Sequence, residues 1–116
     1  MSSVAGSGTD ERVRELKAPH VIYEWNSEKA AANLHKHNVS FAEAASVFLD
    51  PSALTFSDPD HSDEEDREIT IGFSSKQRVV FVSHCERDDH IRIISARRAS
   101  RKERLQYEQG IAEETH

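Results

Sequence analysis

The segment from Arg92 to Tyr107 gathers five arginines and one lysine within sixteen residues of an otherwise acidic chain. Ser100 followed by Glu103 forms a capping box, a pattern that begins a helix. We therefore predict a strand over about 90–96 and a helix from about 101, with Arg97 and Arg98 in the turn between them. Guanidinium groups near a helix N-terminus suit an anion with several oxygens, so the segment predicts a phosphate-binding site.

Arg92 lies inside the apolar part of this segment. Strand alternation places Ile91 and Ile93 on one face and Arg92 with Ile94 on the other. An arginine in such a strand is either a rim residue paired with a carboxylate or a site residue, and both readings stay open for any single arginine. The cluster as a whole favours a site, in which we expect Arg92, Arg97 and Arg98 to contact phosphate.

Lys36 and His37 close a predicted helix over about 27–37. Cations are favourable at a helix C-terminus, so a purely stabilising role is one reading of both residues. The other reading is a proton-transfer group or a phosphate ligand, which suits histidine because its pKa lies near neutrality. Lys36 and His37 are our first candidates for the base and the acid of a reaction.

His61 and Arg67 border an acidic loop and stand behind Lys36 and His37 as candidates. The spacing of His61 relative to the neighbouring acids matches no defined metal site, so we predict no metal. Tyr107 is a candidate for stacking or proton donation, although a helical tyrosine more often packs in a core. His84 is ambiguous, and we interpret Cys85 as structural because adjacent strand residues point to opposite faces. No nucleotide-binding motif is present, so we predict no cofactor.

The chain has 116 residues and a formal net charge of -6, with a mean hydropathy of -0.70. This length predicts one domain, and no apolar run approaches the length of a membrane helix or a secretory signal. We therefore expect a cytoplasmic protein without membrane association. Its single cysteine forms no internal disulfide. Residues 50–68 hold eight acids against one arginine, and residues 76–104 hold nine cations against four acids, which predicts a basic site beside an acidic loop.

The hydrophobic pattern predicts an α+β domain with two layers. We expect a flexible N-terminal arm over 1–19, a single domain over 20–110 with Gly110 ending its last helix, and a frayed tail over 111–116. Asn26 and Ser40 are predicted N-caps, and Asn38 is a predicted helix stop. Two helices follow the first strand at 21–23. Strands at 53–56, 68–73, 78–84 and 90–96 then form an antiparallel meander before the C-terminal helix.

Four stretches together resemble the BrnT family of toxins over about residues 21–109. They are Y-E-W-N-S-E-K-A-A-A-N-L-H-K-H-N-V-S-F-A-E-A-A-S-V-F-L-D-P (Tyr23–Pro51), D-P-D-H-S-D-E-E-D-R (Asp58–Arg67), I-T-I-G (Ile69–Gly72), and R-I-I-S-A-R-R-A (Arg92–Ala99) with E-R-L-Q-Y (Glu103–Tyr107). The chain departs from the family pattern at Asn26, at Asn38 and at Asp66, where the family commonly has Asp, Gly and Glu. The first two replacements keep capping and left-handed turn roles.

The resemblance implies a RelE-like fold and a metal-independent endoribonuclease that inhibits translation. It also implies neutralisation by a BrnA-like antitoxin, a ribbon-helix-helix DNA-binding protein, in a complex of two toxins and two antitoxins. That complex would repress its own operon, and this chain would reach operator DNA only through the antitoxin, because its own net charge of -6 opposes phosphate binding. The alternative is a non-catalytic binding or regulatory module that acts through its partner protein.

Metal-free RNA cleavage needs a base for the 2′-hydroxyl, cations around the phosphate and an acid for the leaving 5′ oxygen. The products are a 2′,3′-cyclic phosphate and a 5′-hydroxyl. We expect Arg92, Arg97, Arg98 and Tyr107 to bind the RNA phosphate. The expected catalytic set is Lys36, His37, His61, Arg67, Arg97 and Arg98.

Overall fold

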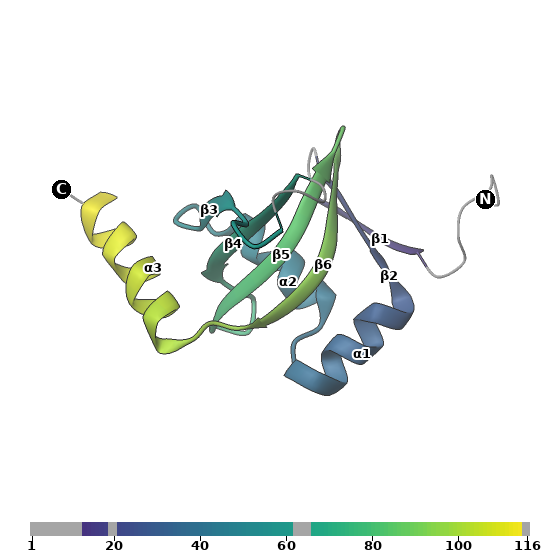
Figure 1. Cartoon of the computed structure of the whole chain (residues 1–116), viewed down its shortest axis with the longest axis horizontal. Helices are drawn as coiled ribbons and strands as arrows, with labels where there is room; N and C mark the ends of the chain where they lie inside the picture. The colour runs from purple at the N-terminus through teal and green to yellow at the C-terminus, as the bar shows by residue number, and fades with distance from the viewer. Residues whose placement is uncertain (1–12, 19–20, 62–65, 115–116) are drawn as a thin grey trace.

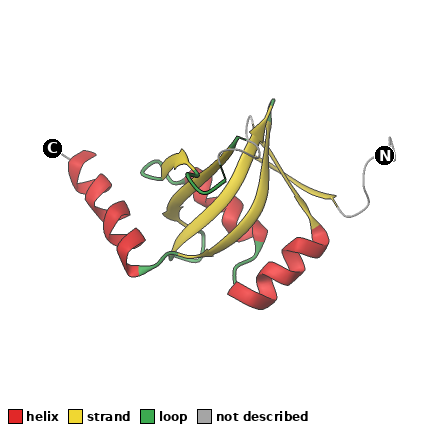
Figure 2. Cartoon of the chain, viewed as in Figure 1, coloured by secondary structure: helices red, strands yellow, loops and turns green. Residues whose placement is uncertain are grey.

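The computed structural model describes residues 13–18, 21–61 and 66–114, with side chains described from residue 21 to 61 and from 66 to 110. One six-stranded sheet has the strand order β1-β2-β6-β5-β4-β3 (Figures 1 and 2). The strands are β1 (Val13–Ala18), β2 (Val21–Asn26), β3 (Leu54–Ser57), β4 (Arg67–Phe73), β5 (Val79–Arg87) and β6 (His90–Arg98). The helices are α1 (Ser27–His37), α2 (Phe41–Ser46), the 3-10 helix η1 (Val47–Leu49) and α3 (Arg101–Glu114).

The predicted α+β architecture is confirmed, with two helices after the predicted first strand, a meander of β3 to β6 and a C-terminal helix. The sheet is mixed, because β2 pairs with β6 in parallel while every other pair is antiparallel. The chain leaves β2 through α1 and α2 and returns at β3, the far edge of the sheet. Periodicity in the sequence does not report which strands are neighbours, so this parallel pair was not predicted.

The predicted flexible arm over 1–19 does not hold for residues 13–18. These residues form β1, which pairs along its length with β2, from Val13 opposite Asn26 to Ala18 opposite Val21. The segment has no clear alternation of apolar residues, so its strand depends on main-chain hydrogen bonds to β2 rather than on a sequence pattern. Residues 1–12 lie outside the described residues.

Two predicted boundaries near the C-terminus are wrong. Strand β6 runs through Arg98, so Arg97 and Arg98 belong to the strand rather than to the turn. Helix α3 continues through Gly110 to Glu114, instead of ending at Gly110 with a frayed tail. A Cβ on Gly110 would lie 3.1 Å from Leu54 Cδ2, so the missing side chain permits close helix–strand contact and does not terminate the helix.

The predicted helix caps at Asn26, Asn38 and Ser100 are confirmed. Asn26 Oδ1 accepts hydrogen bonds from the backbone N–H groups of Glu28 and Lys29, and Asn38 ends α1 with a left-handed φ of 58°. Ser100 and Glu103 form the full capping box, since each backbone N–H donates to the other residue's side chain. These caps place α1 and α3 at fixed positions relative to β2 and β6.

The main core lies between the sheet and the layer of α1 and α2. Phe41, Val47, Val80 and Val82 are buried at its centre. A smaller core lies on the opposite face, where Tyr107 of α3 packs against Ile69 and Ile71 of β4; partly buried neighbours are Leu54, Phe56, Val79 and Phe81. Helix α3 therefore covers only one side of that second face.

Candidate active site

Cross-strand register places two of the predicted cations in one row on the face of the sheet opposite α2. Arg67 of β4 lies opposite Cys85 of β5, and Cys85 lies opposite Arg92 of β6. Two strand spacings separate the two arginines, which is about 10 Å between backbones. Glu24 of β2 completes this row, with an oxygen 3.5 Å from Arg92 Nη1. We call this surface over β4, β5 and β6 the open face.

A β-bulge at Ile94 sets which residues of β6 reach the open face. Ser83 pairs with Ser95 while His84 pairs with Ile93, so Ile94 is the extra residue. The bulge brings Ser95 and Arg97 to the same face as Arg92, although Arg92 and Ser95 are an odd number of residues apart. Simple alternation, which grouped Ile94 with Arg92, did not anticipate this.

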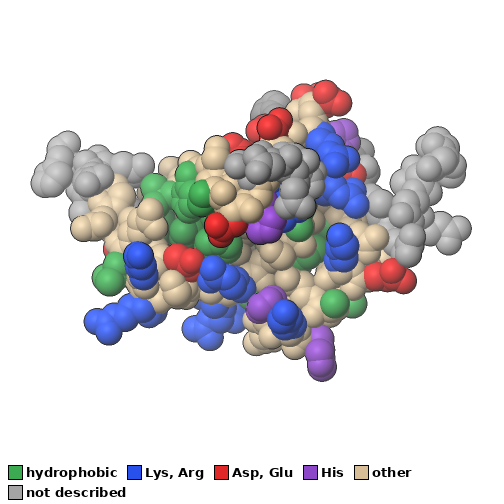
Figure 3. Space-filling view, in the orientation of Figure 1, with side chains coloured by type: hydrophobic (Ala, Val, Ile, Leu, Met, Phe, Trp, Pro, Cys, Tyr) green, Lys and Arg blue, Asp and Glu red, His purple; other side chains and the backbone are tan. Residues whose placement is uncertain are grey.

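Lys36 and His37 lie at the border of the open face. They line a shallow pocket of about 330 Å³ between α1 and the edge of β6, together with Lys29, Asn33, Ile94 and Ser95. Lys36 is exposed and His37 is half-buried. Figure 3 shows Lys, Arg and His side chains along this border, from α3 to α1. The structure thus brings Lys36 and His37 to the same strand segment as Ser95, between Arg92 and Arg97.

His61 forms a pair with a buried carboxylate. Its Nδ1 lies 3.0 Å from Asp58 Oδ2, and the side chain of Asp58 is only 8% exposed. The other oxygen of Asp58 accepts the backbone N–H of Asp60, and the backbone N–H of Asp58 donates to the carbonyl of Arg67. Asp58 therefore fixes the His61 ring beside the start of β4, and Nε2 remains for proton transfer.

Arg97 is held by Glu103 in a bidentate ion pair. Nη1 and Nη2 donate to the two carboxylate oxygens at 2.8 and 2.9 Å, and the guanidinium carbon lies 4.0 Å from the centroid of the Phe81 ring. The hydrogen bonds with Glu103 raise the pKa of Arg97, and the same hydrogen bonds lower the pKa of Glu103. Arg97 thereby ties β6 to the first turn of α3 and has limited capacity for a second anion.

Two of the predicted site residues lie away from the open face. Arg98 pairs with Val80 in the ladder and so faces the other side at the end of β6. Tyr107 is 5% exposed, and its hydroxyl donates to Asp50 Oδ2 at 2.5 Å. It is a packing residue and cannot stack on RNA. The sequence pattern grouped Arg98 and Tyr107 with Arg92, whereas strand alternation directs Arg98 to the other face and core packing buries Tyr107.

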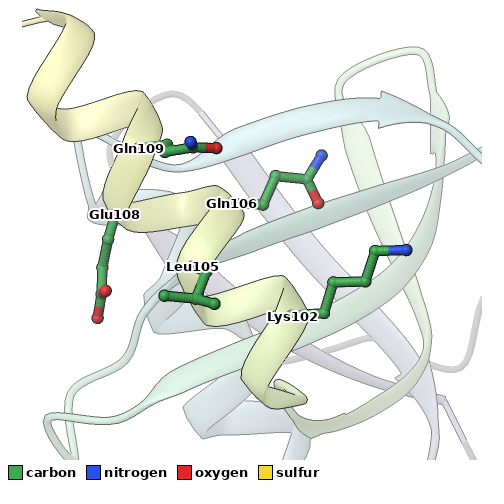
Figure 4. A pocket seen from close by; sticks show the side chains of 5 residues that line it. All are labelled: Lys102, Leu105, Gln106, Glu108 and Gln109. Carbon is green, nitrogen blue, oxygen red and sulfur yellow. The ribbon is translucent and has the colours of Figure 1, made fainter.

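Helix α3 forms the second border of the open face. Lys102, Gln106 and Gln109 point from α3 toward the sheet, while Glu108 points away (Figure 4). These residues and Leu105 line a pocket of about 630 Å³. The open face therefore has polar side chains along both of its borders.

His84 and Cys85 are both buried inside β5 rather than at a strand end. His84 Nε2 lies 2.7 Å from Thr70 Oγ1, on the α2 side of the sheet, and burial lowers its pKa to about 4. In the described part of the chain, no group of three or more His, Cys, Asp or Glu is placed to hold a metal ion. The acidic residues at 63–65, considered beside His61, lie outside the described residues. No described helix has the length and apolar character needed to cross a membrane.

Sequence reasoning missed Asp58 and Ser95. The D-P-D-H segment shows a turn, but a buried aspartate cannot be told from an exposed one by its sequence. Ser95 lies in an apolar strand, and only the bulge directs it to the open face. An aspartate three residues before a histidine was the one available signal for the first of these.

Comparison with known proteins gave a match to a family and a match to a solved structure. The family described as "Ribonuclease toxin, BrnT, of type II toxin-antitoxin system" matches residues 25–103. The crystal structure of the Brucella abortus ribonuclease toxin BrnT is similar, with a TM-score of 0.53 and 25% identity, covering 66% of this chain and 94% of that one. No match was found among curated proteins. The matched span includes α1, the Asp58–His61 pair and strands β4 to β6.

Proposed function

Because this chain belongs to the family of BrnT ribonuclease toxins of type II toxin–antitoxin systems, we propose that it is a metal-independent endoribonuclease whose site is the open face. The Asp58–His61 pair beside Arg67 is the observation that supports this most strongly. A histidine held through Nδ1 by a buried carboxylate presents Nε2 as a proton-transfer group. Arg67 and Arg92 lie in one row of the same face and supply positive charge.

The proposed reaction uses the RNA itself as the nucleophile. A base removes the proton of a 2′-hydroxyl, the 2′ oxygen attacks phosphorus, and the bond from phosphorus to the 5′ oxygen breaks. An acid protonates that oxygen, which leaves a 2′,3′-cyclic phosphate and a 5′-hydroxyl. Arg67 and Arg92 stabilise the charge on the pentacoordinate phosphate. His61 is one of the two proton-transfer groups, and His37 or Lys36 on the α1 border is the other.

Cleavage of a fluorescent RNA in excess chelator tests the proposal, with the product ends identified by mass. We expect cleavage to persist and to yield cyclic-phosphate ends, and His61→Ala to slow it by about 10²- to 10⁴-fold. His35→Ala is the matched control, because His35 is exposed on α1 and lines no pocket of the site. Loss of cleavage in chelator would overturn the metal-independent mechanism, and an equal rate in His61→Ala would remove His61 from it.

We further propose that a BrnA-like ribbon-helix-helix antitoxin neutralises the chain, in a complex of two toxins and two antitoxins that represses its operon. Membership of a toxin–antitoxin family supports an antitoxin partner. Expression alone should arrest growth by inhibiting translation, and co-expression of the adjacent gene product should restore it. Harmless expression of the chain would favour the alternative of a non-catalytic module.

A further inference from the structure

A second basic pocket lies at the junction of β6 and α3, outside the open face. We call it the junction pocket. It has a volume of about 410 Å³, and its side-chain lining includes Phe73, Gln77, Arg78, Arg98, Arg104 and Glu108. Arg97 and Arg98 are adjacent in β6 and point to opposite faces, so the junction pocket begins where the open face ends.

The charge in the junction pocket comes from Arg98 and Arg104. Arg78 is neutralised, because its guanidinium donates to both carboxylate oxygens of Glu43 at 2.7 and 2.8 Å. Arg98 and Arg104 are exposed, and among the described residues neither side chain has a hydrogen bond or an ion pair. Glu108 is the single acid in the lining. Arg98 and Arg104 thus line one small pocket together.

An exposed aromatic ring lies in the same lining. Phe73 ends β4 with 45% of its surface exposed, although its backbone N–H is fixed by Asp50 Oδ2 at 2.8 Å. An aromatic ring beside unpaired cations is the combination that proteins use to bind single-stranded nucleic acid, because the ring stacks on a base while the cations contact phosphates. A free anion alone would make no use of Phe73.

We infer that the junction pocket binds a nucleotide of the RNA strand beyond the one that is cleaved, with its base on Phe73 and its phosphates at Arg98 and Arg104. This inference rests on the proposed function, since it takes RNA as the substrate. The strand passes from the open face around the end of β6. Arg98 thereby contacts RNA away from the scissile phosphate.

The test uses the full chain and an oligonucleotide of about 12 nucleotides with a 2′-O-methyl group on every ribose. This probe lacks the 2′-hydroxyl, so its binding is measured without cleavage. Phe73→Ser should weaken binding about tenfold. The double variant Arg98→Gln, Arg104→Gln should make the negative slope of log affinity against log salt less steep by about 1.4. Glu108→Gln should tighten binding.

The matched controls are Arg101→Gln, which removes an exposed arginine of the same helix turn, and Leu49→Ser, which removes an apolar side chain that is 67% exposed. Neither residue lines the junction pocket, and both variants should keep the parent's affinity. Thermal unfolding followed by circular dichroism verifies that every variant is folded. Folded pocket variants with the affinity of their controls would overturn the inference.

Two other outcomes separate this inference from the proposed function. A chain that binds the probe through the pocket but leaves unmodified RNA intact refutes the cleavage mechanism and keeps the pocket. If the chain cleaves RNA and the pocket variants bind the probe as tightly as the parent, only the role of the pocket is refuted. If the pocket variants keep their affinity for RNA but no longer bind the antitoxin, the pocket is part of the interface with the partner protein. This outcome also overturns the inference.

Discussion

His61, the proposed proton-transfer group, and His84, a core residue, have opposite surroundings. His61 is 43% exposed and has a carboxylate partner on Nδ1. His84 is 2% exposed, and its ring centroid lies 4.9 Å from that of Phe48. It also shares a hydrogen-bond chain with Thr70 and Thr55. The residue type alone did not distinguish them. Burial and the partner atoms are the reason that we propose His61, and not His84, as a proton-transfer group.

His61 should depend on Asp58 for its orientation. Asp58→Asn keeps the size of the side chain but removes the charge that favours a proton on His61 Nδ1. We expect the cleavage rate to fall about tenfold or more. This loss is smaller than the loss caused by removing the whole acid or base group. The pH–rate profile is the decisive measurement, since a purely structural role for Asp58 would leave its inflection points in place.

His84 should make stability depend on pH. Its pKa is about 4 in the folded chain against a reference of 6.5, so the folded state resists protonation. Titration of His84 therefore leaves stability unchanged above about pH 6.5 and removes about 3 kcal/mol in total as the pH falls toward 4. Urea unfolding at several pH values measures this loss.

His84→Gln is the control for this effect. It removes the titrating ring, so the decline in stability between pH 6.5 and 4 should become shallower, while carboxylates elsewhere still titrate. An unchanged decline in His84→Gln would show that other groups cause it.

At the scale of elements, Asn33 joins α1 to the edge of β6 where β2 no longer pairs. Its side-chain amide donates to the carbonyl of Ala96 and accepts the N–H of Ala96, at 2.8 and 3.1 Å, as a neighbouring strand would. It also donates to the carbonyl of Val39. This contact positions Lys36 and His37 beside Ser95.

Asn33→Leu should destabilise the fold by about 3 to 5 kcal/mol, because it leaves several buried main-chain groups without partners. Asn26→Ala, which removes an exposed helix cap, should cost only about 1 kcal/mol and serves as the comparison. Chemical denaturation measures both, and equal costs would refute the strand-like role of Asn33.

The approach of η1 to β4 requires Gly72. A Cβ at this position would lie 2.8 Å from Val47 Cγ1 and 2.9 Å from Ala53 Cβ. Gly72→Ala should therefore cost about 1 to 3 kcal/mol through overpacking. Combining it with Val47→Ala should cost less than the sum of the two changes, and strict additivity in a double-mutant cycle would argue against the contact.

At the scale of the whole molecule, the main core and the proposed site lie on opposite faces of the sheet. The main core and the buried Glu43–Arg78 pair lie between the sheet and the layer of α1 and α2. The proposed chemistry lies on the opposite face, which α3 covers only in part. Strand β1 extends the sheet beyond the span matched by the family, 25–103.

Removal of residues 1–18 should test the role of β1. The truncation leaves one edge of β2 without its ladder, so we expect a lower melting temperature and faster amide exchange in β2. The β3–β6 meander, which contains the open face, should keep its protection in hydrogen-exchange mass spectrometry. Equal protection of β2 with and without residues 1–18 would show that β1 adds no stability.

The sequence by itself determined the helix caps, the main order of elements and the family. Caps at Asn26, Asn38 and Ser100 are short-range interactions, so their residue types are sufficient to predict them. The α+β order of elements followed from hydrophobic periodicity, and the joint motif indicated the ribonuclease toxin family. Only the tertiary structure decided which cations share a face. The bulge at Ile94, the parallel β2–β6 pair and the burial of Asp58 and Tyr107 depend on contacts between distant segments. A local sequence pattern holds no information about such contacts, so it misplaced Arg97, Arg98 and Tyr107.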